Sequence, residues 1–150
     1  MPSSTLAAPL PGPVVGFITS ARVARLATAD AGGQPMVVPI CYAFDGAALY
    51  SAVDAKPKQA PPEGLKRIRN LRDNPRVSIV IDEYEEDWTK LRYVIIQGRA
   101  DLLTDGPQFS HGVDLLIAKY DQYRTLGLGR DHGLLIRVTP SRVSSWQYSS

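Results

Sequence analysis

Short apolar runs of strand length, separated by tight polar turns, limit what this chain can fold into. Runs rich in β-branched and aromatic residues, set between clusters of Gly, Pro, Asn and Asp, predict antiparallel strands. The clearest turn is Asp45-Gly46, because a two-residue hairpin needs residues that tolerate positive φ. We expect strands over 23–28, 35–44, 47–53, 76–84, 90–103, 134–138 and 142–146.

Few segments carry helical periodicity beside these strands. In the clearest one, Leu65, Ile68 and Leu71 recur at helical spacing while basic residues occupy the other faces. We expect helices over 14–21, 63–73 and 105–124. Many strands with short connections and few helices do not form a doubly wound parallel sheet. The sequence therefore predicts a mainly β fold, a closed or split β-barrel with peripheral helices.

Length and composition are those of one globular domain. The 150 residues are 44% hydrophobic and 21% charged, and the net charge of +2 is too small to imply a nucleic-acid or membrane partner by itself. Residues 1–13 hold four prolines, so we expect a flexible or extended N-terminal arm before a domain over 14–150. The single cysteine, Cys41, forms no internal disulfide, and there is no signal-peptide pattern or membrane-length apolar run. We therefore expect a cytoplasmic protein.

Two prolines mark the strand over 35–44 as unusual. Pro35 and Pro39 lie four residues apart, so their missing N–H groups fall on the same edge of the strand. That edge is open to solvent, to a second subunit or to a ligand. Solvent is disfavoured because the neighbouring residues are apolar: Met36, Val37, Val38 and Ile40. A flat ring docked along the strand is one explanation, and an ordinary edge strand whose prolines discourage aggregation is the other.

Basic residues follow the third predicted strand. Lys56 and Lys58 flank Pro57 in a segment that leads into the basic helix over 63–73. Two ammonium groups beside a helix N-terminus suit a phosphate group. A solvated loop with a solvated helix face is the ordinary alternative. An RNA-binding helix is disfavoured because no aromatic residues are interleaved with the basic ones.

Acidic residues surround the end of the strand over 76–84. Five of them lie in 82–87, followed by Trp88, and no histidine lies nearby, so we expect solvated acids rather than a metal site. Trp88 is expected to close a pocket or an interface, or to belong to the core. No nucleophile, phosphate-loop or zinc motif occurs, and Cys41 has no evident base beside it. Chemistry carried by a cofactor is therefore favoured.

These motifs together resemble the pyridoxamine 5′-phosphate oxidase-like split β-barrel proteins, and most closely the branch that uses the deazaflavin coenzyme F-420. The resemblance covers roughly 14–148, and its matching stretches are 24–28, 33–39, 45–46, 49–51, 56–58, 69–77, 87–98 and Trp146. The stretch 59–64 departs from the family pattern, because it separates the two lysines from the helix.

The resemblance implies a homodimer with two cofactor sites at the subunit interface. The cofactor ring would lie along the strand that carries Pro35, Met36, Val37, Val38, Pro39 and Ile40. The phosphate would meet Lys56 and Lys58, with Arg69 or Asn70 nearby, and Trp88 would approach the site from its own chain or from the partner.

Three hypotheses follow for the activity. The first is an F-420-dependent oxidoreductase that transfers a hydride between deazaflavin and a small organic substrate. The second is an FMN-dependent oxidoreductase on the same fold, because FMN and F-420 share a tricyclic ring and a phosphate. The third is a module that binds a flavin, a deazaflavin or haem without turnover. Nucleic acid, membrane and metal ion are not expected as partners.

Overall fold

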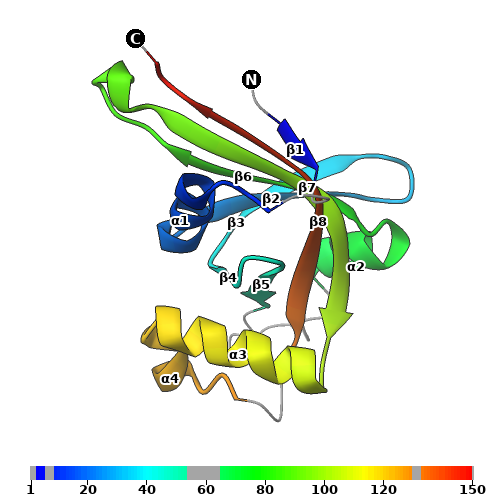
Figure 1. Ribbon diagram of the computed structural model, residues 1–150. Coiled ribbons are helices and arrows are strands. Elements are labelled where there is room, and N and C mark those ends of the chain that lie inside the picture. Colours follow the sequence, from blue (N-terminus) through cyan, green and yellow to red (C-terminus); the bar gives the residue numbers. More distant parts are fainter. Residues whose placement is uncertain (1–2, 6–8, 54–64, 130–132, 150) are drawn as a thin grey trace.

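A single antiparallel sheet forms the frame of the molecule (Figure 1). The computed structural model describes residues 3–5, 9–53, 65–129 and 133–149. Seven strands follow in the order β3-β2-β6-β7-β8-β5-β4, and β1 pairs with β8. The strands are β1 (Ser3–Thr5), β2 (Ala24–Ala29), β3 (Pro35–Ile40), β4 (Ala43–Phe44), β5 (Leu49–Ala52), β6 (Arg76–Glu83), β7 (Arg92–Leu103) and β8 (Leu135–Gln147).

The helices pack around one side of this curved sheet (Figure 1). They are α1 (Gly12–Ser20), α2 (Lys66–Asp73), α3 (Pro107–Lys119) and α4 (Gln122–Leu126), and a short 3-10 turn, η2, spans Trp88–Lys90. Helix α1 begins two residues before the predicted start at residue 14, because Pro11 provides the extended backbone of the cap and Pro13 fits the first turn. Within the predicted arm over 1–13, β1 pairs antiparallel with β8. None of the described helices is long and apolar enough to span a membrane.

The core lies inside the curved sheet and continues under α3. Leu26, Ile79 and Ile96 from neighbouring strands are fully buried on the concave side. The periodic residues Ile68 and Leu71 of α2 are buried in the same core, as predicted. Alternate burial along the strands and one buried face per helix give the predicted mainly β barrel with peripheral helices.

The barrel is split between β3 and β4. These two strands are separated along the chain only by Cys41 and Tyr42, yet they lie at opposite ends of the strand order. The fully buried Tyr42 fixes this break, since its hydroxyl donates to the Ile18 carbonyl at 2.5 Å. Across the split, Ser51 Oγ donates to the Cys41 carbonyl at 2.8 Å. The single strand predicted over 35–44 was therefore wrong, because it breaks at the split into β3 and β4.

The two last predicted strands, over 134–138 and 142–146, form the single strand β8. They are continuous because β7 pairs with both halves, with a register shift between Gln97 and Gly98. Gly98 makes this bulge possible, since a Cβ at that position would collide with the carbonyl oxygen of Thr139. The predicted helix over 105–124 is likewise divided, because Tyr120 takes an extended backbone between α3 and α4.

Candidate functional site

Strand β3 is an edge strand, and its outer edge is open. Asp30 N donates to the Gln34 carbonyl at 3.1 Å, and pairs alternate along the antiparallel β2–β3 ladder. The backbone groups of Pro35, Val37 and Pro39 therefore face away from β2. The open edge predicted from the two prolines is confirmed within β3. Val37 is the residue of β3 that keeps an N–H group on this edge.

The side chains of β3 differ between its two faces. Pro35, Val37 and Pro39 are exposed, and Val37 has an exposed fraction of 63%. On the other face Met36 and Val38 are half-buried and Ile40 is buried. The strand thus offers an apolar surface next to an unpaired backbone edge, which is the combination that a flat ligand or a second protein surface can cover.

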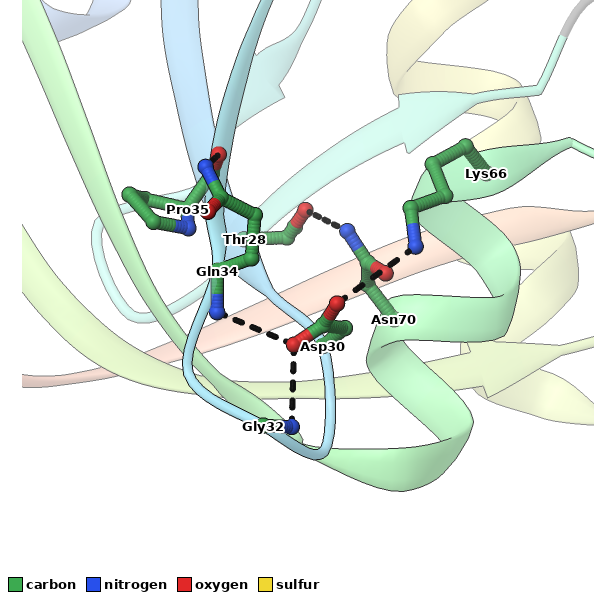
Figure 2. A network of polar contacts seen from close by, with 7 residues as sticks. All are labelled: Thr28, Asp30, Gly32, Gln34, Pro35, Lys66 and Asn70. Atoms are coloured by element: carbon green, nitrogen blue, oxygen red, sulfur yellow. Dashed lines mark hydrogen bonds and ion pairs between the residues drawn. The ribbon is translucent and has the colours of Figure 1, made fainter.

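A polar network ties the β2–β3 turn to α2 (Figure 2). The Asp30 carboxylate accepts hydrogen bonds from the N–H groups of Gln34 and Gly32, each at 2.9 Å, and lies 3.8 Å from Lys66 Nζ. These contacts hold the pKa of Asp30 below its usual value, with the bond from Gln34 as the largest cause. The turn that precedes β3 is therefore fixed to the first residue of α2.

The predicted ligands Arg69 and Asn70 lie on different sides of α2. Asn70 is buried, with 1% of its surface exposed, and its Nδ2 donates to Thr28 Oγ1 at 3.0 Å (Figure 2). Its Oδ1 is buried without a partner among the described residues. Arg69 is exposed. Asn70 therefore joins α2 to β2, and the structure does not bring these two side chains together. Lys56 and Lys58 lie outside the described residues.

A cavity of about 280 Å³ lies at the split of the barrel. Its wall combines the end of β3 with β5, the first turn of α2 and α4, and its lining residues are Val23, Pro39, Ile40, Cys41, Ser51, Ala52, Arg67 and Tyr123. Arg67 is the charged residue of this lining, and its Nε is buried with no hydrogen-bond partner among the described residues. A buried cationic donor without an acceptor is costly, so the arrangement favours an anionic ligand.

The N-terminus of α2 adds to the positive potential of this cavity. Arg67 is the second residue of the helix, and the first backbone bonds of α2 run from the N–H groups of Ile68 and Arg69 to Leu65. The preceding N–H groups, at Lys66 and Arg67, lie at the positive end of the helix dipole. A phosphate or carboxylate group fits this place. The sequence placed a candidate phosphate group beside this helix start, but it did not single out Arg67.

The remaining predicted features lie elsewhere. Trp88 belongs to η2 at the tip of the β6–β7 hairpin, which projects from the rest of the molecule (Figure 1), and 63% of its surface is exposed. The acids before it are not simply solvated, since Asp82 lies 2.9 Å from Arg25 and Glu83 lies 2.7 Å from Arg92. Within one chain, the tip of this hairpin and the cavity at the split are separate places.

The described residues form no metal site, and those that line the cavity form no acid–base pair. They contain no cluster of metal-ligating side chains. His111 Nε2 lies 2.9 Å from Asp45 Oδ2, where it joins α3 to the turn between β4 and β5. Larger hollows of about 560, 540 and 580 Å³ lie beside α1 and on the convex side of the sheet, but the orphaned Arg67 Nε points to the smaller cavity as the ligand site.

A curved antiparallel sheet that is open between β3 and β4, with helices outside it, defines the split β-barrel class of proteins. Residues 10–147 match the family model of pyridoxamine 5′-phosphate oxidase, and the chain belongs to this family. A comparison with curated proteins finds no match.

Solved structures of the same fold bind different rings, as their names state. A FAD-binding protein from Mesorhizobium loti is 28% identical, with a TM-score of 0.71 over 99% of this chain and 97% of that one. The haem storage protein HutZ from Vibrio cholerae is 19% identical, with a TM-score of 0.70 over 93% and 95%. An F-420 reductase is 20% identical, with a TM-score of 0.63 over 90% and 98%. The fold is thus shared by proteins whose names describe FAD binding, haem storage and F-420 reduction.

Proposed function

We propose that this chain is an oxidoreductase that binds coenzyme F-420 and transfers a hydride between this deazaflavin and a small organic substrate. The cavity at the split carries the proposal, because it joins an orphaned buried Arg67 Nε to the open apolar edge of β3. A phosphorylated tricyclic cofactor has the two matching parts, an anionic group and a flat ring. The resemblance to F-420-dependent proteins and the structural likeness to an F-420 reductase support the choice of deazaflavin.

The residues would divide the binding as follows. Arg67 and the first N–H groups of α2 would hold the phosphate, with Lys56 and Lys58 as further predicted ligands. The ring would lie along β3, where the Val37 N–H is available on an edge that two prolines keep free of other strands. Ile40 and Pro39 would cover apolar surface of the cofactor at the cavity wall.

When bound, the cofactor supplies the hydride. The described residues of the cavity would contribute position and shielding, and the Ser51 hydroxyl donates to the Cys41 carbonyl. The apolar walls of the cavity would exclude water from the ring and hold it beside the substrate. The Arg67 guanidinium and the α2 dipole hold the anionic part away from the reacting atoms.

We also propose that the site is completed in a homodimer. The cavity of about 280 Å³ is at or below the lower end of the roughly 300–1,000 Å³ usual for small-molecule sites. One described chain therefore encloses only part of a cofactor of this size. Trp88, exposed on the projecting hairpin, is suited to reach the site of the other subunit.

FMN is the second candidate cofactor, and one titration decides between the two. The family model and the likeness to a FAD-binding protein favour a flavin. Purified protein is titrated with F-420, FMN, FAD and haem, and oxidation of each reduced flavin or deazaflavin is then followed with a panel of enones and quinones. Tight F-420 binding with turnover is expected. Tighter binding of FMN or FAD, with turnover, would replace the cofactor in the proposal.

Storage of a ring without turnover is the third candidate, favoured by the likeness to a haem storage protein. Binding of F-420 with no oxidation by any member of the panel would support this candidate and contradict the enzyme. Binding of haem alone, with a Soret band that saturates at one haem per chain, would contradict both redox proposals.

A further inference from the structure

A second hollow adjoins the cavity at the split. Its volume is about 370 Å³, and its wall joins the end of α1 and the start of β2 to the facing ends of β6 and β7. Small-molecule sites usually enclose roughly 300–1,000 Å³, so this hollow has the size of one. Val23 lines both spaces, and 41% of its surface is exposed. This shared apolar side chain offers a contact for the carbon skeleton of a ligand that reaches from one space into the other.

The pairing of β2 with β3 sets this hollow beside the proposed cofactor ring. Ala24 lies opposite Ile40, so the preceding residue, Val23, lies next to Cys41 where β3 ends. In the function proposed above, the ring lies along β3 with Ile40 against it. The hollow therefore opens at the end of that strand, from which a substrate can approach the ring.

The charges that line this hollow do not balance. Asp82 Oδ1 lies 2.9 Å from Arg25 Nη1. Glu83 Oε2 lies 2.7 Å from Arg92 Nε, so both acids of the lining are already paired. The remaining arginine of the lining, Arg22, forms no ion pair within the ranges that the structure describes. The hollow thus keeps one uncompensated positive charge.

The Tyr120 side chain fixes the position of Arg22. The centre of the Tyr120 ring lies 4.5 Å from Arg22 Cζ, and the Tyr120 hydroxyl donates to the Arg22 carbonyl at 2.8 Å. A guanidinium stacked on an aromatic face keeps its edge, with the N–H donors, open to a planar acceptor. Arg22 is therefore placed to bind a carboxylate with little further loss of side-chain freedom.

Lys119 adds a second positive charge beside Arg22. Its Nζ donates to the Ala21 carbonyl at 2.6 Å, and it too forms no ion pair in the described part of the chain. Burial is the largest cause of the lowered pKa of Lys119, and repulsion from Arg22 is the next. Two cations that repel each other, with no acid between them, favour an anion from outside.

We propose that this hollow binds the carboxylate of a small organic acid through Arg22, and that this acid is the substrate of the hydride transfer. The inference deepens the proposed function, and its second part rests on that function. The carbon skeleton of the acid would cross Val23 toward the ring on β3, while Arg22 would hold the carboxylate at the far end. A single carboxylate matches the charge that is left over in the hollow.

A matched pair of substrates tests this inference. Cyclohexenone and oxocyclohexenecarboxylate share the same enone ring, and only the second carries a carboxylate. Oxidation of reduced F-420 gives KM and kcat for both compounds with the parent, with Arg22→Gln and with Arg22→Lys. A charge-assisted bond to a carboxylate is worth about tenfold or more, so the parent is expected to show a KM for the acid about tenfold below that for cyclohexenone. Arg22→Gln is expected to abolish this preference, and Arg22→Lys to retain part of it.

The matched control is Arg72→Gln, which removes an exposed arginine from the far end of α2. It is expected to keep the full preference for the acid, because Arg72 lies outside the lining of the hollow. Near-identical circular dichroism of all variants verifies folding.

A binding measurement separates this inference from the proposed function. Isothermal titration gives Kd of oxocyclohexenecarboxylate for the parent and for Arg22→Gln, without cofactor and with oxidised F-420. Acid binding that Arg22→Gln weakens about tenfold, in a protein that does not oxidise reduced F-420, would support the carboxylate site and overturn its role in the reaction. Turnover of both compounds with equal KM, no binding of the acid in either state, or a Kd that Arg22→Gln leaves unchanged would overturn the carboxylate site. F-420 turnover of cyclohexenone in those cases would leave the redox function standing.

Discussion

Lys119 shows how one residue joins three elements at an electrostatic cost. Its Nζ donates to the Ala21 carbonyl at 2.6 Å and lies 4.1 Å from the centre of the Tyr42 ring. Both contacts favour the ammonium form, yet burial, followed by repulsion from Arg22, lowers the pKa of Lys119 to about 8. The side chain thus links the end of α1 to α3 beside the break between β3 and β4, and it is charged at neutral pH against a desolvation penalty.

The lowered pKa of Lys119 predicts a change of stability with pH. Between about pH 8 and the ordinary lysine pKa of 10.5 the unfolded chain holds this proton and the folded chain does not. The contribution of Lys119 to the free energy of unfolding therefore increases as the pH rises through that window. Urea unfolding of the parent and of Lys119→Met is compared at pH 7, 8, 9 and 10. The free energy of unfolding of the parent is expected to rise relative to that of the variant as the pH increases. Lys90→Met, at an exposed position in η2, is the control, and an equal pH trend in both variants would contradict the assignment.

At the scale of elements, α3 is placed by a close approach to β5. A Cβ on Gly112 would lie 2.5 Å from Tyr50 Cδ1 and 2.8 Å from Leu135 Cδ1, and both of these side chains are buried. Glycine at this position lets the helix lie directly on the sheet. The same helix carries His111, which binds the Asp45 carboxylate that closes the β4–β5 turn.

Gly112→Ala is expected to destabilise the protein by about 1–3 kcal/mol, because the added methyl group overpacks the contact between α3 and β5. The free energy of unfolding in urea measures this loss. Gly16→Ala in α1 is the matched control, since its Cβ meets no atom within 4 Å and alanine favours a helix by roughly 0.5–1 kcal/mol. Equal stabilisation by both substitutions would show that α3 does not approach β5 this closely.

The sequence predicts those elements that are set by neighbouring residues, and it fails where contacts between distant segments decide. The open edge of β3 follows from Pro35 and Pro39 alone, because a missing N–H group is a local property. The continuity of β8 does not, since it depends on Gly98 admitting the Thr139 carbonyl from a distant segment. The break at Tyr42 likewise depends on a hydrogen bond to Ile18.

The candidate site divides in the same way. The sequence predicts a ring along the apolar residues of β3 and a phosphate group near the start of α2, from composition and order along the chain. Arg67 was not singled out from its basic neighbours, because only tertiary packing buries its Nε at the split. Asn70, expected near the phosphate, packs against Thr28 instead, since it lies on the face of α2 that meets β2. Helical spacing from Ile68 and Leu71 does not indicate this burial, because residues one or two positions apart do not share a face of a helix.

At the scale of the whole molecule, the split in the barrel is the feature that defines the candidate site. It leaves a cavity in which Arg67 Nε has no acceptor among the described residues. In the proposal made above, the phosphate of a bound cofactor would be that acceptor. Proteins of this fold are named for different ligands: FAD, haem and F-420.

The central claim is that Arg67 holds the anionic part of the cofactor, and the affinity of Arg67→Ala for F-420 tests it most directly. Quenching of F-420 fluorescence gives Kd for the parent, for Arg67→Ala and for Arg72→Ala, which removes an exposed arginine from the far end of α2. A charge-assisted bond to phosphate contributes about 1.5–3 kcal/mol, so Arg67→Ala is expected to raise Kd at least tenfold while Arg72→Ala leaves it unchanged. Equal affinities in all three proteins would contradict the account.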